Sequence, residues 1–181
     1  MLKFYRGITK RLQRFIEQQK LFFVATAPKQ GRINLSPKGM DSFRILNDTK
    51  VAWLSVTGSG NETSAHLLEN NRITIMFCAF EGAPNILRLY CTAVEILESD
   101  QNWNEYKKLF PEYPGVRQIF IADIQSIQTS CGMSVPYYEY KGEREQLNQW
   151  AEDKGEDGIK SYWDKINQQS IDGLKTKFFK D

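Results

Sequence analysis

Apolar and polar residues alternate over short runs along most of the first 130 positions, a pattern that predicts strands. Turn-forming residues separate these runs, and the first two, joined by PKQG, indicate a hairpin. The six predicted strands are residues 21–27, 32–37, 50–56, 72–80, 85–98 and 116–128. The chain is therefore expected to be mainly antiparallel β.

Helical spacing appears mostly around the strands. It predicts a first helix over Lys10–Lys20, a short one after the Gly58–Asn61 loop, and one over Ser99–Phe110 with Ser99 or Asp100 as N-cap. Two polar helices are predicted at 143–153 and 156–169. This order of elements favours a small β-barrel with added helices over a doubly wound sheet.

One predicted strand is apolar on both faces. In RITIMFCAF, residues 72–80, Ile73, Ile75 and Phe77 lie on one face, and Met76 and Cys78 lie on the other. A strand with two apolar faces belongs in a closed barrel, under a helix, or under a partner subunit.

Length and composition limit the classes of function. The 181 residues suit one domain, with a core over about 8–135 and a helical extension over about 140–175. The net charge of +2 is scattered, which predicts no nucleic-acid partner. The absence of a long apolar run predicts no membrane partner and favours a cytoplasmic protein. Three separated cysteines and one histidine, His66, favour neither a disulfide framework nor a metal site.

The stretch GSGNETSAHLLENN, residues 58–71, follows a predicted strand and opens a helix. Gly58 and Gly60 turn the chain, and Asn61 or Thr63 can cap the helix. Free N–H groups at such a start bind anions, phosphate included, without a loop lysine. The alternative is a helix cap with a purely structural role.

Ser36 and Lys38 end the second strand of the hairpin, two residues apart and so on one face. A hydroxyl and an ammonium presented together can clamp a phosphate. The alternative is that Lys38 is simply a solvated strand-end lysine.

Taken together, these segments resemble a known family. The stretch from Ile33 to Leu97 (INLSPKGMDSF … LYCTAVEIL) is similar to the core of the pyridoxamine 5′-phosphate oxidase-like FMN-binding split β-barrel proteins, and the similarity extends over about residues 8–170. The resemblance implies an α+β fold, mainly antiparallel β: a six-stranded split β-barrel with peripheral helices. It also implies FMN as cofactor, held in a cleft between the subunits of a homodimer.

The resemblance further implies the residues that bind the cofactor. Lys38 matches the family's strand-end lysine, and Thr63 and Ser64 stand where the vitamin-making enzymes have an Arg-Lys pair. Arg88 is the expected compensating cation. The complete set of expected cofactor contacts is Ser36, Lys38, Trp53, Leu54, Ser55, Gly60, Asn61, Thr63, Ser64, Arg88, Ser130, Cys131 and Trp150.

The reaction is constrained by what the sequence lacks. It has neither the C-terminal Arg-x-His motif nor the Arg-Pro…Ser stretch with which the vitamin B6 enzymes hold their substrate, and catalytic residues are not identifiable. The leading hypothesis is an FMN-dependent oxidoreductase acting on an unidentified small molecule. The alternatives are a non-catalytic flavin-binding or sensing dimer, and a relative that uses F420 or haem.

Overall fold

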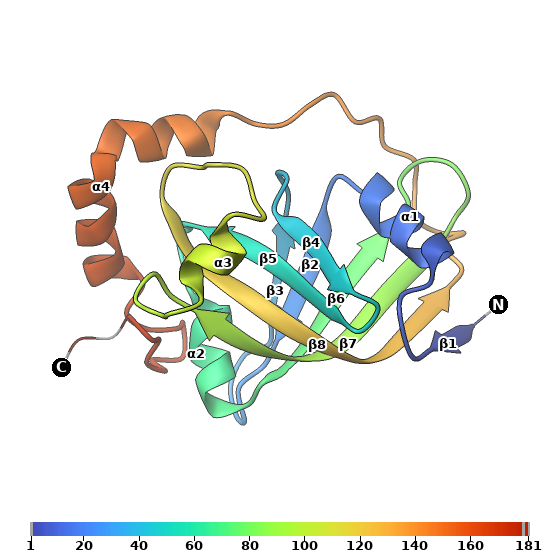
Figure 1. Ribbon diagram of the computed structural model, residues 1–181, viewed down its shortest axis with the longest axis horizontal. Coiled ribbons are helices and arrows are strands. Elements are labelled where there is room, and N and C mark those ends of the chain that lie inside the picture. Colours follow the sequence, from blue (N-terminus) through green and yellow to red (C-terminus); the bar gives the residue numbers. More distant parts are fainter. Residues whose placement is uncertain (1, 179, 181) are drawn as a thin grey trace.

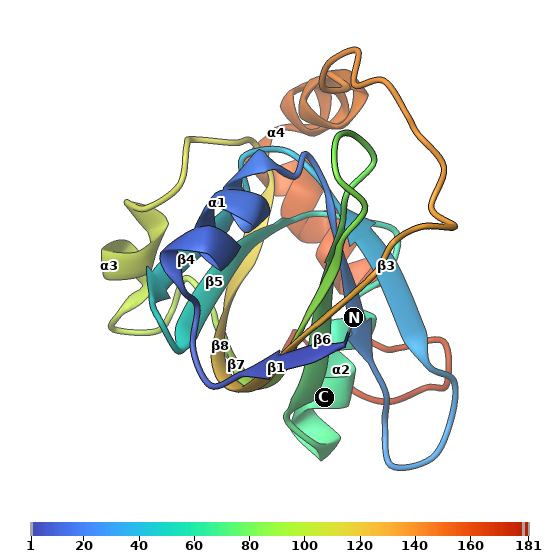
Figure 2. The same cartoon turned by 90° about the vertical axis from the view of Figure 1, so that its right-hand side faces the viewer.

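The computed structural model describes residues 2–178 and 180, in which a curled antiparallel sheet carries helices around its rim (Figures 1 and 2). The strands are β1 (Lys3–Tyr5), β2 (Phe22–Thr26), β3 (Asn34–Lys38), β4 (Phe43–Asn47), β5 (Lys50–Val56), β6 (Arg72–Cys78), β7 (Ile86–Ile96) and β8 (Val116–Ser130). The helices are α1 (Lys10–Gln18), α2 (Glu62–Glu69), α3 (Trp103–Lys107) and α4 (Gln146–Ile166).

All strands belong to one sheet with the order β3-β2-β6-β7-β8-β5-β4, and β1 pairs with β8 off this path. Every pairing is antiparallel. The ends of the order, β3 and β4, do not pair with each other within the described chain, so the sheet curls without closing. The predicted fold class is confirmed.

The sheet has eight strands, and the predicted number of six is therefore wrong. The six predicted strands are all present, and the two that were missed are β1 and β4. β1 is only three residues long and pairs with β8 across more than 120 positions of sequence. β4 has no clear alternation in burial, because four of its five residues are half-buried. Neither strand carries the periodicity on which the prediction depended.

The main core lies inside the curled sheet and is covered at one end by α1. This helix begins after Thr9, whose Oγ1 accepts a hydrogen bond from the N–H of Leu12 at 3.4 Å. It buries Leu12 and Ile16 against the apolar residues of β2, β6, β7 and β8. In β6 one face is buried, as predicted, whereas Met76 on the other face stays half-exposed.

The remaining helices differ from prediction at their ends. α3 begins at Trp103, later than expected, because the Asp100 carboxylate accepts the N–H of Leu97 at 2.8 Å and no side chain caps the helix. The two predicted C-terminal helices are both present within α4, on either side of Gly155, whose φ of 63° and ψ of 174° are not helical and suit a glycine. Within the described residues no helix is both long enough and apolar enough to cross a membrane.

The core makes a first prediction possible. Phe77 is 1% exposed and its ring lies 5.7 Å from that of Phe22 and 5.1 Å from that of Phe43. Phe77→Ala should lower the free energy of unfolding by about 3–5 kcal/mol, because a cavity replaces a buried ring. Urea denaturation measures the change. The control, Tyr137→Ala at a 79% exposed position, should change stability by no more than about 0.5 kcal/mol.

Candidate functional site

A cleft of about 260 Å³ lies at the β3 end of the open sheet, between β3, β5, the start of β8 and the start of α2. Seven of the predicted site residues line it: Ser36, Lys38, Trp53, Ser55, Gly60, Asn61 and Thr63. Residues that the prediction missed also line it, among them Asn34, Glu62, Arg117, Gln118 and Phe120. The two segments identified from the sequence, at the end of β3 and at the start of α2, therefore do meet.

Lys38 is the last residue of β3, and the alternation along this strand carries Asn34, Ser36 and Lys38 into the cleft together. Burial lowers the pKa of Lys38 to about 8, and repulsion from Arg117 adds to the effect. The lysine is half-buried, so the interpretation as a fully solvated strand-end lysine is wrong. A bound anion would favour the charged form of Lys38 and so oppose this lowering of its pKa.

Arg117 is the cation that sequence reasoning missed. It is 5% exposed near the start of β8, and its Nη1 donates to the Gly60 carbonyl at 3.1 Å and to Asn167 Oδ1 at 2.6 Å. Its Nε is buried and has no hydrogen-bond partner within the described chain. Burial lowers its pKa to about 10, which leaves it charged at neutral pH. The signal in the sequence was a cation and an amide, Arg117 and Gln118, immediately before the apolar run Ile119–Ala122.

The start of α2 faces the cleft without a side-chain cap. Asn61 occupies the N-cap position but makes no capping hydrogen bond, and Thr63 does not cap the helix either. Instead, Asn61 Nδ2 donates to Gln118 Oε1 at 3.3 Å, and Gln118 Nε2 donates to Asn61 Oδ1 at 2.7 Å. Because the amides satisfy each other, the first-turn N–H groups are left free of the cap side chain. The predicted cap is therefore wrong, and the positive end of the helix is open to a ligand.

The floor of the cleft is aromatic. Trp53 is fully buried on β5, and its ring stacks on Phe120 of β8 with centroids 4.5 Å apart. Its Nε1 is a buried donor with no partner in the part of the chain described. Trp53 Nε1 and Arg117 Nε are thus two orphaned donors that belong to residues lining the same cleft. Buried donors normally have acceptors, so an ordered water or the acceptor groups of a bound molecule would satisfy this pair.

The other predicted site residues lie elsewhere. Leu54 lines an adjoining hollow of about 190 Å³ that shares Lys38 and Ser55 with the cleft. Ser64 is fully buried and donates to Glu95 Oε2 at 2.9 Å. The remaining four predicted residues, which line neither the cleft nor this hollow, are Arg88, Ser130, Cys131 and Trp150.

Arg88 does not supply the compensating cation within its own chain. Its Nη1 donates to Ser130 Oγ at 3.2 Å across β7 and β8. Cys131 is exposed just beyond β8, and Trp150 packs edge-on against Tyr162 on α4. In this chain the cation beside Lys38 is Arg117, because β8 enters the sheet next to β5 at that position.

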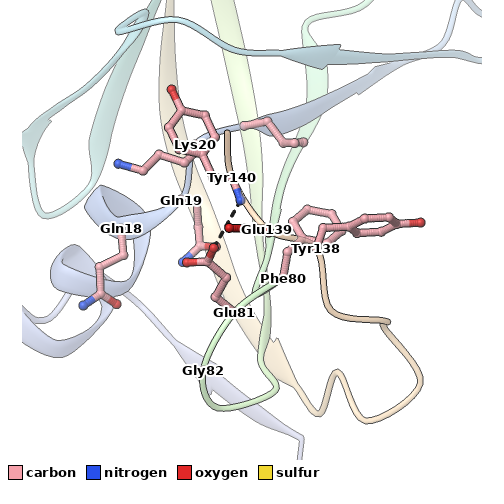
Figure 3. A pocket seen from close by; sticks show the side chains of 10 residues that line it. Gln18, Gln19, Lys20, Phe80, Glu81, Gly82, Tyr138, Glu139 and Tyr140 are labelled. Carbon is pink, nitrogen blue, oxygen red and sulfur yellow. Dashed lines mark hydrogen bonds between the residues drawn. The ribbon is translucent and has the colours of Figure 1, made fainter. Parts of the chain in front are cut away.

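A larger hollow of about 680 Å³ lies at the end of α1, between the β6–β7 turn and the segment 138–140 (Figure 3). None of the predicted site residues lines it. Its charged side chains are Lys20, Glu81 and Glu139, and Lys20 Nζ already lies 5.4 Å from the Tyr140 ring centre. The lining is therefore acidic on balance and repels an anion. Despite its smaller volume, the cleft between β3, β5, β8 and α2 is the better anion site.

His66 is closed off from any ligand. It lies in α2 with 1% of its surface exposed, and its Nδ1 is 3.0 Å from Thr26 Oγ1. A metal ion or haem iron has no route to this ring in the described fold. The side chain packs α2 against the end of β2.

Glu95 is a buried acid beside the start of α2. It is 5% exposed, and its Oε1 has no hydrogen-bond partner within the described residues. Burial raises its pKa to about 6, against the opposing effects of the Ser64 hydroxyl and of Lys177. Ionised Glu95 also favours the charged form of Arg117.

Comparison with known proteins adds family information to this geometry. The model of the family described as pyridoxamine 5′-phosphate oxidase matches residues 8–131. The pyridoxamine 5′-phosphate oxidase family protein ustO of Aspergillus flavus is 38% identical over 191 aligned residues, covering 94% of this chain and 76% of the relative.

Two solved structures of HupZ from Group A Streptococcus share the fold. A single-residue variant of HupZ superposes with a TM-score of 0.55 at 22% identity, covering 68% of this chain and 99% of HupZ. The second HupZ structure superposes with a TM-score of 0.53 at 23% identity, covering 66% of this chain and 91% of HupZ. At these identities the likeness concerns the fold alone.

The buried acid gives a testable pH dependence. The pKa of Glu95 is higher in the folded protein (about 6) than its ordinary value of 4.5, so the folded state holds its proton longer. Stability from this group is complete below pH 4.5 and falls as pH rises to 6, by about 2 kcal/mol. Glu95→Gln should remove this fall. The measurement is the unfolding free energy of the variant and of the unmodified protein, each at pH 4 and at pH 7. Glu139→Gln, at an exposed position, should leave it in place.

Proposed function

Because the chain belongs to the pyridoxamine 5′-phosphate oxidase family, we propose that it is an FMN-binding flavoprotein and an FMN-dependent oxidoreductase that acts on a small molecule. The observation that carries the proposal is the cleft between β3, β5, β8 and α2, where Lys38 and Arg117 lie beside the uncapped start of α2. Two cations and free N–H groups form a site for a phosphate. The cytoplasmic location expected from the sequence belongs to the same proposal.

The residues present fit the phosphate end of FMN. Lys38 and Arg117 supply the charge that the missing Arg-Lys pair would have supplied at Thr63 and Ser64. The Trp53 indole N–H and the hydroxyls of Ser36 and Ser55 are donors for the polyol or the ring edge. At about 260 Å³ the cleft is smaller than a typical ligand pocket of roughly 300–1,000 Å³. It suits the phosphate and part of the chain attached to it.

The rest of the cofactor then needs a second surface, which we propose is another copy of this chain. Large apolar side chains are exposed at several strands, including Phe4, Ile33, Leu35 and Val94. Ile33 and Leu35 flank Asn34, a cleft residue, so that exposed apolar side chains lie at the sheet-end strand β3, which also lines the cleft. Arg88, Ser130, Cys131 and Trp150 remain predicted cofactor contacts, reaching the cleft from the partner subunit.

Bound FMN would supply a ring that accepts and donates hydride or single electrons. The chain's own residues would bind the phosphate and the polyol beside it, and the buried Trp53–Phe120 pair would keep water out of the floor of the cleft. Among the described residues that line the cleft there is no histidine for proton transfer. The carboxylate that lines the cleft, that of Glu62, already accepts the N–H of Ile171 at 3.0 Å. The protein's part is thus binding and orientation.

The visible absorption spectrum of the purified protein, before and after adding FMN and desalting, tests the proposal. Retention of the two bands of oxidised flavin supports it, and their loss on adding NAD(P)H supports turnover. Bands that respond to dithionite alone favour the alternative of a flavin-binding dimer without catalysis. A protein that retains no flavin contradicts the proposal.

Removal of the strand-end lysine is the first test of the cleft itself. Lys38→Ala should weaken FMN binding by about 1.5–3 kcal/mol, the usual value for a charge-assisted contact, and should preserve the fold. Flavin fluorescence quenching measures the affinity. Lys20→Ala, which removes the lysine of the larger hollow, serves as the control and should leave the affinity unchanged.

The same lysine predicts a pH dependence of binding. Its pKa of about 8 in the free protein means that it loses its charge as pH rises above 8, whereas a bound phosphate favours the charged form. FMN affinity should therefore fall about twofold between pH 7 and 8 and then more steeply, by at most about tenfold per pH unit. Lys38→Arg keeps its charge throughout this range and should flatten the profile. An unmodified protein with a flat profile would show that the phosphate does not contact Lys38.

A further inference from the structure

The segment that follows α4, residues 167–177, runs back along the start of α2 and the loop before it (Figure 1). The Ile171 N–H donates to the Glu62 carboxylate at 3.0 Å, and the Lys177 N–H donates to Ser64 Oγ at 3.2 Å. Lys177 Nζ donates to the Glu95 carbonyl at 2.8 Å. Residues 82 to 113 positions apart are thus tied together beside the cleft.

Asn167 makes the contact closest to the proposed phosphate site. It is fully buried at the C-cap of α4, where its Nδ2 donates to the Gly58 carbonyl at 3.1 Å. Its Oδ1 accepts from Arg117 Nη1 at 2.6 Å. One amide therefore holds both the loop before α2 and the buried cation.

Asn167 is itself held firmly in place. Its carbonyl accepts from Thr176 Oγ1 at 2.8 Å, and its N–H donates to the Trp163 carbonyl at 3.0 Å. Trp163 Nε1 in turn donates to Thr57 Oγ1 at 2.8 Å, immediately before Gly58. The amide is fixed from both sides, so it can fix the orientation of Arg117.

The orientation of Arg117 decides which of its donors face the cleft. The guanidinium is planar, so two acceptors on Nη1, the Gly60 carbonyl and Asn167 Oδ1, set the direction of the whole group. The buried Nε is left without an acceptor in the described residues. An anion in the cleft can supply that acceptor.

We propose that Asn167 is a positioning residue for anion binding: it aims Arg117 and holds the Gly58–Asn61 loop, so that the C-terminal segment forms part of the phosphate site. This inference rests on the proposed function in that the anion is taken to be the phosphate of FMN. The competing explanation is that Asn167 only caps α4 and stabilises the fold.

Comparing two flavins separates these explanations, because riboflavin lacks the phosphate. Asn167→Ala should weaken FMN binding about tenfold or more and change riboflavin binding less than about twofold, measured by flavin fluorescence quenching. The matched control is Asn70→Ala. Asn70 Nδ2 also donates to a carbonyl, that of Ala27 at 2.7 Å, but at the other end of α2. This variant should leave both affinities unchanged.

Equal losses for FMN and riboflavin, or no loss for either, would overturn the positioning role. If Asn167→Ala does not fold, Asn167→Asp keeps the side-chain volume and places a carboxylate against Arg117. The aspartate should compete with phosphate and produce the same selective loss of FMN. A selective loss supports the role, and unchanged FMN binding in a folded Asn167→Asp variant overturns it.

Failure of the proposed function would look different, since the unmodified protein would then bind neither flavin. In that case inorganic phosphate is the probe, read as the rise in Tm with phosphate concentration. If phosphate raises the Tm of the unmodified protein and of Asn70→Ala, but not that of the Asn167 variants, the result still supports the positioning of Arg117 by Asn167. The same rise in all of them, or in none, overturns it.

Discussion

The pairing of β8 with three other strands is the constraint on which the rest of the structure depends. β7 lies along one side of its fifteen residues, and β5 and then β1 lie along the other. This shared strand curls the sheet so that β3 and β4 become its ends. The cleft lies at the β3 end of this open sheet, between β3 and the end of β5, and Arg117 and Gln118 near the start of β8 line it. The same strand therefore shapes the core and presents the buried cation.

Keeping charge beside the core has a cost that the surrounding residues only partly offset. Lys38 and Arg117 both have lowered pKa values because burial disfavours their charged forms, and Arg117 adds to the effect on Lys38. Glu95 favours the charge on Arg117, yet burial raises its own pKa to about 6. Such an arrangement stores unfavourable electrostatic energy that an anionic ligand would relieve. Perturbed groups that converge on a cleft are typical of functional sites.

The sequence predicted those parts of the fold and the site that local periodicity encodes. Alternation along β3 correctly placed Ser36 and Lys38 on one face, whereas only the family resemblance put Gly60 and Thr63 at the same site. The cap at Asn61 was mispredicted because its partner, Gln118, is 57 positions away. Long-range pairing likewise hid β1.

The choice of cation shows the limit most clearly. Arg88 was favoured because it lies near a cofactor-facing position of the family, whereas Arg117 was passed over beside the apolar run Ile119–Ala122. Only the pairing of β8 with β5, together with Asn167 from the C-terminal segment, gives Arg117 its place in the cleft. Both contacts depend on residues 50 or more positions away, and neither leaves a periodic trace in the sequence. The net charge of +2 is equally uninformative, since two buried cations at one cleft do not alter a chain with 24 basic and 22 acidic residues. Anion binding here thus follows from where the topology buries charge, and not from how much charge the chain carries.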